Sequence, residues 1–243
     1  MPLKSSKKFK PLLLIAILIS GIFSAAYLLG WSTLLTVNEV RIQGSTATEV
    51  ILSELRRREL EPIAGQKLAR VEIRSVKRVL SDLDWLSSAE VSRNWFSKRI
   101  EIKVVERVAV ARALTESNLL VNFDSEGLIF NPTSSNQLKG QDLLPLVTTA
   151  GNSRTDLVYI AKLLKQMPNE LNYLISDLDQ ISVTKAGYII MSTKINGKFV
   201  RINWGNIDQI EQKFSVLQQL LKLPENRGLE QVDLSEPKAP IVK

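Results

Sequence analysis

The side chains best able to do chemistry in this sequence are two closely spaced pairs of carboxylates. Asp82 and Asp84, and likewise Asp177 and Asp179, lie two positions apart. Paired carboxylates can act as general acid and base in hydrolysis, or can bind a calcium ion. Neither pair lies in a glycine-turned loop with the calcium spacing, so we interpret both as helix-end or turn residues. A hydrolase using carboxylates alone would need two acids that converge across a cleft.

Cysteine and histidine are both absent from the 243 residues. Without them the chain has no thiolate or imidazole metal ligand, no cysteine or histidine nucleophile and no Ser-His-Asp triad. It also has no glycine-rich phosphate loop. We therefore predict that the protein is not an enzyme and has no catalytic residue, metal site, cofactor or small-molecule substrate. A binding or scaffolding role is favoured.

The N-terminal segment predicts a membrane anchor. Residues 1–11 form a basic tail with four lysines and no acid, and residues 12–35 are uncharged and mostly apolar. About twenty helical residues cross the roughly 30 Å hydrocarbon core of a bilayer. The basic tail favours a cytoplasmic N-terminus, so the bulk of the chain is expected to be extracytoplasmic. We predict a single-pass protein of the plasma (inner) membrane.

A cleaved signal peptide is the alternative interpretation of the same segment. Ser24-Ala25-Ala26 has the small-residue spacing that a signal peptidase accepts. The apolar stretch is longer than the usual signal core of roughly 7–15 residues, which favours the anchor. In either case the remainder of the chain is exported.

The positive net charge is distributed unevenly. Of the net +7, the tail supplies four lysines, whereas residues 39–105 have 13 basic and 10 acidic residues and residues 106–243 have 15 of each. Neither external part has the strong basic excess of a nucleic-acid-binding domain. No nucleic-acid partner is predicted.

Residues 37–105 are expected to form a compact α+β module. Alternation in Val37–Gln43 predicts a half-buried strand ended by Gly44. Helices are predicted from Ser45 or Thr46 to Arg58 and from Arg70 to Leu83, followed by strands at 89–93 and 99–106. In the first helix Val50, Ile51 and Leu55 are expected to be buried, and Ser45 or Thr46 to cap it, with Glu49 completing a capping box. Arg56-Arg57-Arg58 is expected on its solvated face.

Residues 106–243 change to short strands and turns. A hairpin is predicted at 119–130, an exposed loop at 131–142 and a helix at 157–167. A three-stranded meander is predicted from strands at 181–183, 188–193 and 198–202, with Asn196-Gly197 as its second turn. An amphipathic helix at 207–221 and a closing strand at Gln231–Leu234 complete the expected mixed β-sheet domain with flanking helices.

Several of these segments together resemble the FtsQ/DivIB family of single-span bacterial division proteins. Val37–Gly44 is similar to the opening strand of that family's POTRA (polypeptide-transport-associated) domain, in which Val40, Ile42 and Gly44 occupy motif positions. Asp84-Trp85-Leu86 and Val91–Trp95, with Arg93 and Trp95, resemble its "lpWv" and "V-x-R-x-W-P" motifs, although Phe96 replaces the proline.

Further along the chain, three more segments carry the resemblance. Glu106-Arg107 begins a segment similar to the family's "E-R-x-P-V-A" domain junction, here without the proline. Ile202–Gly205 resembles the "i-x-l-G" strand end, and Val232-Asp233-Leu234 the "v-D-L-R-Y" closing strand. The resemblance implies two extracytoplasmic domains, a POTRA domain at 37–105 (β-α-α-β-β) and an FtsQ-type β domain at 106–243.

Each motif also has a purely structural interpretation. Gly44 can simply end a strand, since its backbone is unrestricted. Trp85 and Trp95 are large apolar side chains that are expected in the core. Glu106 and Arg107 are expected at a solvated domain junction.

The closing strand carries the functional hypothesis. A strand with a free edge can receive a strand of another chain. The resemblance implies that this edge receives the division partner FtsB, paired with FtsL. The candidate partner-binding residues are Val232, Leu234, Ser235, Glu236, Lys238, Ala239 and Ile241.

The residues after the closing strand depart from the family pattern. Ser235 and Glu236 replace an Arg-Tyr pair, so an arginine contact with the partner is not carried over. Pro237 and Pro240 lack ladder donors, and an edge-blunting tail is therefore an equal alternative.

The resemblance implies a membrane-anchored scaffold of the divisome at the division septum, which tethers early and late division proteins. The alternative from another class is a POTRA-type chaperone or translocation subunit that binds exported polypeptides. Such proteins usually have several POTRA repeats or a membrane β-barrel, and the sequence has no internal repeat.

Overall fold

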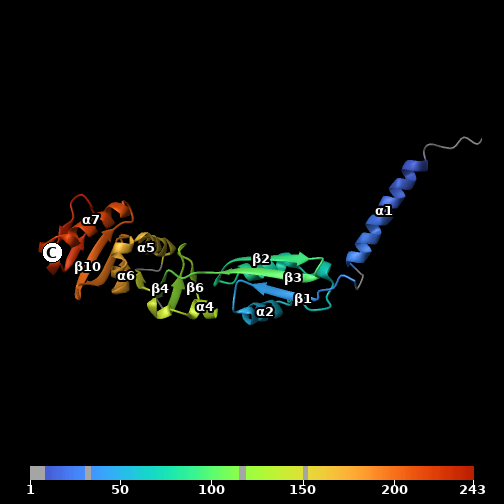
Figure 1. The fold of residues 1–243 in the computed structure, drawn as a ribbon, viewed down its shortest axis with the longest axis horizontal. Coiled ribbons are helices and arrows are strands. Elements are labelled where there is room, and N and C mark those ends of the chain that lie inside the picture. The colour runs from blue at the N-terminus through green and yellow to red at the C-terminus, as the bar shows by residue number, and fades with distance from the viewer. Residues whose placement is uncertain (1–8, 31–33, 115–118, 150–152) are drawn as a thin grey trace, which may run out of the picture. The chain divides into compact units, whose positions relative to one another are not determined.

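The computed structural model describes residues 9–30, 34–114, 119–149 and 153–243 (Figure 1). The chain divides into two compact units, Met1–Val105 and Glu106–Lys243. Helices and mixed sheets occur in both, so the α+β class expected from the sequence is confirmed.

Helix α1 (Phe9–Gly30) is the first described element, and the apolar side chains described along it, such as Leu14 and Phe23, are exposed. The expected apolar span 12–35 includes residues 31–33, which lie outside the described residues, as does most of the basic tail. The described helix ends at Gly30, and beyond it the Leu35 carbonyl accepts a hydrogen bond from the amide of Leu68 (3.0 Å). Among the described helices, none has the length and hydropathy needed to cross a membrane.

The remainder of the first unit has the element order strand, helix, helix, strand, strand. It contains β1 (Glu39–Gln43), α2 (Thr48–Arg57), the 3₁₀ turn η1 (Leu68–Arg70), α3 (Ile73–Ser81), β2 (Leu86–Asn94) and β3 (Arg99–Glu106). The sheet order is β1-β3-β2, and β1 runs parallel to β3. Ile51 and Leu55 on α2, and Val76 and Leu80 on α3, are fully buried at i, i+4 spacing.

Two details of α2 differ from expectation. Val50 is 41% exposed, so only Ile51 and Leu55 form the buried stripe of this helix. The helix begins at Thr48 without a side-chain cap, because the hydroxyl of Ser45 accepts the amide N–H of Ala47 instead (3.0 Å). The arginines that end the helix are exposed, as expected.

The second unit is built on one mixed nine-stranded sheet with the order β12-β11-β10-β9-β8-β7-β4-β5-β6. Its strands are β4 (Ala111–Leu114), β5 (Leu120–Phe123), β6 (Ile129–Phe130), β7 (Leu146–Thr149), β8 (Leu178–Val183), β9 (Ile189–Ile195), β10 (Lys198–Gly205), β11 (Gln231–Asp233) and β12 (Ile241–Val242). Strands β8, β9 and β10 form the predicted antiparallel meander, and β5 and β6 the predicted hairpin.

The helices of the second unit are α4 (Ser135–Leu138), α5 (Arg154–Gln166), α6 (Tyr173–Ser176) and α7 (Ile210–Lys222), with 3₁₀ turns η2 (Gln141–Leu143), η3 (Asn169–Leu171) and η4 (Pro224–Gly228). Apolar residues of α5 and α7 join those of the strands in a single core. Trp204 on β10 is fully buried there and packs edge-on against Phe214 of α7, with ring centroids 5.3 Å apart.

Part of this unit differs from the sequence-based prediction. Strands β4 and β7 were not predicted, and the expected exposed loop at 131–142 contains α4 and η2. The reason for α4 is local: the Ser134 hydroxyl accepts the amide N–H of Gln137 (3.1 Å), and the Gln137 side chain accepts the amide of Ser134 (3.3 Å). This capping box starts a helix within a polar segment.

Candidate functional site

The predicted closing strand is not the edge of the sheet. Strand β11 pairs in parallel with β10, as Ile202 lies opposite Val232, and it also pairs antiparallel with β12. The expected free edge on Gln231–Leu234 is therefore wrong, because Ile241–Val242 returns and covers it. The edge at this end of the sheet is β12.

The seven candidate partner-binding residues divide into two groups. Val232 and Leu234 are both 0% exposed and belong to the core. The remaining candidates lie exposed in the turn after β11 or on β12; they are Ser235, Glu236, Lys238, Ala239 and Ile241. An approaching protein can contact this second group without unfolding the sheet, whereas it cannot reach the first.

The backbone of β12 presents an alternating ladder. Gln231 and Lys243 exchange both backbone hydrogen bonds, at 3.0 and 3.1 Å. In an antiparallel ladder the neighbouring pair, Val232 and Val242, makes no such exchange, so the N–H and C=O of Val242 point away from β11. Ile241 and Val242 are 59% and 37% exposed. The edge thus offers one donor and one acceptor beside two apolar side chains.

A polar network fixes the turn that leads from β11 to β12. The Asn203 amide donates to Asp233 Oδ2 (2.9 Å), and Asp233 Oδ1 accepts from both the backbone N–H (2.9 Å) and the hydroxyl (2.6 Å) of Ser235. Burial raises the pKa of Asp233, but the bonds from Ser235 and Asn203 and the charge of Lys213 outweigh it and lower the pKa overall. The Asp233 carboxylate is therefore kept ionised at the end of β11, where the turn to β12 begins.

Lys213 on α7 is a buried cation behind this turn and was not among the predicted site residues. Its ammonium donates to the carbonyls of Trp204 and Asn206, both at 2.8 Å, and the side chain is only 1% exposed. Burial lowers the pKa of Lys213, while nearby Asp208, Glu236 and Asp233 oppose that shift. Lys213 lies at a position of α7 that faces the core, and a charge at such a position is the signal that could have revealed it.

Gly205 brings β10 close to the same turn. It has φ +64, and a Cβ at this position would lie 2.8 Å from the Cα of Ser235. Only glycine allows this approach without displacing the turn. Gly205, Lys213 and the Asn203–Asp233–Ser235 bonds together hold the C-terminal segment against the sheet.

In the first unit, the three motif residues of the opening strand lie against the neighbouring strand β3. Val40 and Ile42 are half-buried on β1, opposite Ile100 and Ile102 of β3. Gly44 has φ +94, and a Cβ there would lie 1.9 Å from the carbonyl oxygen of Val104. Gly44 is therefore required by close backbone contact as well as by its own conformation.

The tryptophan and arginine motif residues have three different environments. Trp85 is buried, as expected, but Trp95 is 38% exposed in the turn after β2, so its expected core position is wrong. Arg93 donates to the carbonyls of Leu68 (2.8 Å), Ala69 (3.3 Å) and Val71. Burial lowers the pKa of Arg93, whose guanidinium joins β2 to the 3₁₀ turn η1.

Glu106 and Arg107 are partly buried rather than solvated, which corrects the sequence-based expectation. Arg107 pairs with Asp124, and their side chains are only 13% and 9% exposed. Glu106 Oε2 accepts the hydroxyl of Ser134 (2.7 Å). Both residues therefore stabilise the β5–β6 end of the second unit.

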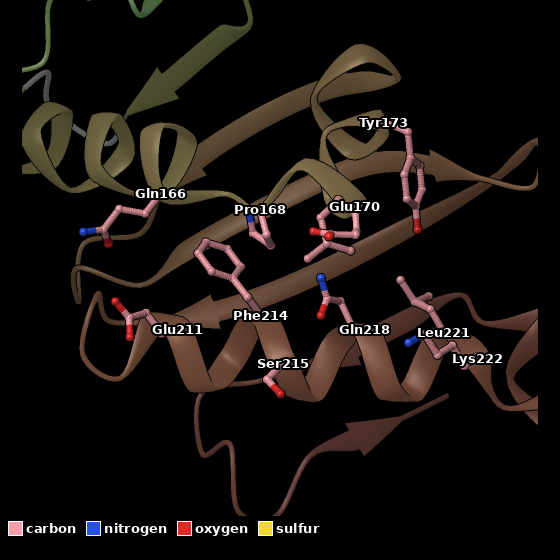
Figure 2. Close-up of a pocket in the computed structure, with 11 residues that line it drawn as sticks. Gln166, Pro168, Glu170, Tyr173, Glu211, Phe214, Ser215, Gln218, Leu221 and Lys222 are labelled. Atoms are coloured by element: carbon pink, nitrogen blue, oxygen red, sulfur yellow. The ribbon is translucent and has the colours of Figure 1, made fainter.

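The second unit also has a surface groove between α7 and the chain from Gln166 to Tyr173, with a volume of about 620 Å³ (Figure 2). Phe214, Leu221 and Pro168 supply apolar surface, and Glu170 and Glu211 add carboxylates. Within the described part of the chain, no group of three or more histidine, cysteine, aspartate or glutamate residues could hold a metal ion.

Comparison with protein families identifies the second unit. Residues 112–235 match the family described as cell division protein FtsQ/DivIB, C-terminal. The match extends from β4 through β11 to Ser235 and stops before β12. The comparison with curated proteins finds no match. Because the family model covers about half of the chain, the resemblance seen in the sequence is confirmed: the chain belongs to the FtsQ/DivIB family, and its role lies in cell division.

Proposed function

We propose that the protein is a non-enzymatic, membrane-anchored scaffold of the divisome. The uncharged segment 12–35 anchors it in the plasma membrane with the N-terminus in the cytoplasm. The POTRA-like first unit and the β-rich second unit lie outside the cytoplasm and tether early and late division proteins. Several modest interfaces confined to one membrane combine through effective concentration.

The observation that carries this proposal is the exposed edge strand β12. A partner strand that adds to β12 gains hydrogen bonds with the outward N–H and C=O of Val242 and covers Ile241 and Val242, which are 59% and 37% exposed. We propose that the partner is the FtsB/FtsL-like pair that the family relationship suggests. Glu236 and Lys238 in the adjacent exposed turn give the interface polar contacts of both signs.

A proline scan of the edge tests this role. Val242→Pro removes the outward N–H while the bonds between Lys243 and Gln231 remain possible. Val242→Ala, the control, keeps the N–H and removes more of the apolar side chain than the proline does. We expect the full chain with Val242→Pro to lose co-purification of the FtsB/FtsL-like pair and the Val242→Ala chain to retain most of it. Equal capture by both variants would reject strand addition at β12.

Localisation tests the wider role. A full-length copy tagged with a fluorescent protein at the N-terminus should form a band at the constriction of dividing cells. A uniform envelope signal would overturn the scaffold proposal. The Val242→Pro copy should still reach the membrane, because its anchor segment is unchanged.

A further inference from the structure

One end of the first unit exposes a group of large apolar side chains. Phe96 is 101% exposed and Trp95 is 38% exposed in the turn that joins β2 and β3. Ile63 is 61% exposed in the loop after α2, and Leu34, ahead of β1, is 64% exposed. We call these four residues the apolar tip.

Backbone pairing shows that the segments carrying the apolar tip share one end of the sheet. Strand β1 starts beside the start of β3, since Glu39 lies opposite Arg99 and the amide of Asn38 donates to the carbonyl of Lys98 (2.8 Å). The 95–98 turn precedes β3 directly, so it lies at this end (Figure 1). The loop that carries Ile63 lies there too, because Val37 exchanges backbone hydrogen bonds with Gly65 and Gln66, both at 2.8 Å.

The same end receives the chain from α1. Helix α1 ends at Gly30 and β1 begins at Glu39, so eight residues connect them. Eight residues span at most about 28 Å. If α1 lies in the anchor proposed above, the start of β1 is tethered within at most that distance of the bilayer surface.

The charge at this end suits an anionic lipid surface. Helix α2 ends there, because the chain that follows it returns to Val37. Its last residues include Arg57 and Arg58, which share the carboxylate of Glu54 and are 64% and 53% exposed. Glu59 follows Arg58 directly and offsets its charge. The positive charge beside the apolar tip comes instead from Lys98 in the 95–98 turn and from Lys67, which bridges to Thr36 ahead of β1. Basic side chains next to exposed aromatic rings are typical of segments that lie at a membrane interface.

We propose that the apolar tip is a membrane-contact surface, with Trp95 and Phe96 inserted in the interfacial layer of the bilayer that holds the N-terminal anchor. Tryptophan and phenylalanine combine apolar area with a preference for that layer. The contact would hold the first unit against the membrane and restrict its orientation. This inference rests on the anchor of the proposed function.

The absence of cysteine makes a direct test possible, since one introduced cysteine is the only labelling site. Ile63→Cys places a bimane fluorophore on the tip and leaves Trp95 and Phe96 native. Phe199→Cys is the matched control, because Phe199 is 62% exposed on β10 in the second unit. Each full-length chain is reconstituted in phosphatidylcholine–phosphatidylglycerol vesicles containing lipids with a spin label on the acyl chain, which quenches nearby fluorophores.

We expect the label at position 63 to be quenched several-fold more strongly than the label at position 199. Phe96→Ser in the Ile63→Cys background should bring the quenching close to that of the control. Equal quenching at positions 63 and 199, or no change on Phe96→Ser, would overturn the membrane contact.

An alkaline carbonate wash of the same vesicles separates the two proposals. A chain that stays with the vesicles but is not quenched at position 63 refutes only the contact of the apolar tip. A chain that the wash releases refutes the anchor, and the inference that rests on it is then refuted as well.

Discussion

The two ends of the nine-stranded sheet each finish with a strand of two residues, yet they are built differently. At one end Phe130 of β6 is 1% exposed, and the nearby Ser134 is fully buried. At the other end both residues of β12 are exposed. Equal strand length therefore does not make equal edges, and what differs is where the polar network lies.

At the β6 end the network lies around the outermost strands. The ion pair of Arg107 and Asp124 and the bond between Glu106 and Ser134 connect the entry to the unit with the β5–β6 turn and α4. At the β12 end the network of Asn203, Asp233 and Lys213 lies one or two strands further in. The first arrangement holds Phe130 and Ser134 in the interior, although Ile129 of β6 is 39% exposed, whereas the second leaves both residues of the edge strand exposed.

Breaking the network at the β6 end should have the largest effect on stability. Asp124→Ala leaves Arg107 without its carboxylate partner and removes the acceptor of the Glu126 and Leu128 amides (2.8 and 2.9 Å). We expect a loss of about 3–5 kcal/mol in the free energy of unfolding, measured by denaturant unfolding of the full chain in detergent. Asp124→Asn keeps an oxygen for the turn and should lose less, whereas equal losses would show that the ion pair alone matters.

Gly205→Ala tests the crowded contact between β10 and the turn after β11. The new Cβ would lie 2.8 Å from Ser235, at a positive φ. We expect a loss of about 3 kcal/mol and weaker capture of the partner at β12. Gly187→Ala is the control: it also has positive φ (+79) but open space around it, and should cost only about 1 kcal/mol. If the two variants were equally stable, the close contact between position 205 and Ser235 would not contribute to the free energy of unfolding.

Lys213→Met should destabilise the second unit by about 2 kcal/mol, since the carbonyls of Trp204 and Asn206 lose a buried donor. Lys222→Met on the same helix is the control, because Lys222 is exposed and should change stability by less than about 0.5 kcal/mol. Thermal unfolding of both variants in detergent measures the difference. A neutral Lys213→Met would mean that water replaces the ammonium at no cost.

The smallest expected effect is the pH dependence that Asp233 contributes. Its pKa is lower in the folded than in the unfolded chain, so its stabilising contribution is present above the unfolded pKa of about 4 and is lost as pH falls through the folded value. We expect wild type to exceed Asp233→Asn in stability at neutral pH and the difference to shrink in acid. A difference that is constant with pH would assign the loss to hydrogen-bond geometry instead of charge.

Local patterns in the sequence predicted most elements correctly where one stretch of chain contained the whole signal. The i, i+4 spacing of Ile51 and Leu55 located α2, and Asn196-Gly197 located the turn between β9 and β10. Strands β4 and β7 were missed. Both are only four residues long, and β7 pairs in parallel with β4 and β8, which are distant in sequence, so no hairpin turn marks it.

The site was less predictable than the fold. Val232 was correctly placed on a strand and Leu234 lies directly after its end, but the burial of both depends on neighbours distant in sequence, such as Ile202 on β10 opposite Val232. Trp95 was expected in the core by its size, whereas its position in the 95–98 turn exposes it. Residue type and spacing do not report which side of a strand is covered by a later segment.

The sequence by itself determined the absence of cysteine and histidine chemistry, the uncharged N-terminal segment and the order of most elements, because each depends on residue identity or local periodicity. Only the tertiary structure decided that β12 covers β11, that Lys213 is buried behind the turn and that the apolar tip gathers at one end. These depend on pairings between distant residues, such as Gln231 with Lys243 and Asn38 with Lys98. Such pairings reflect the competition of the whole chain for a shared core and a continuous sheet.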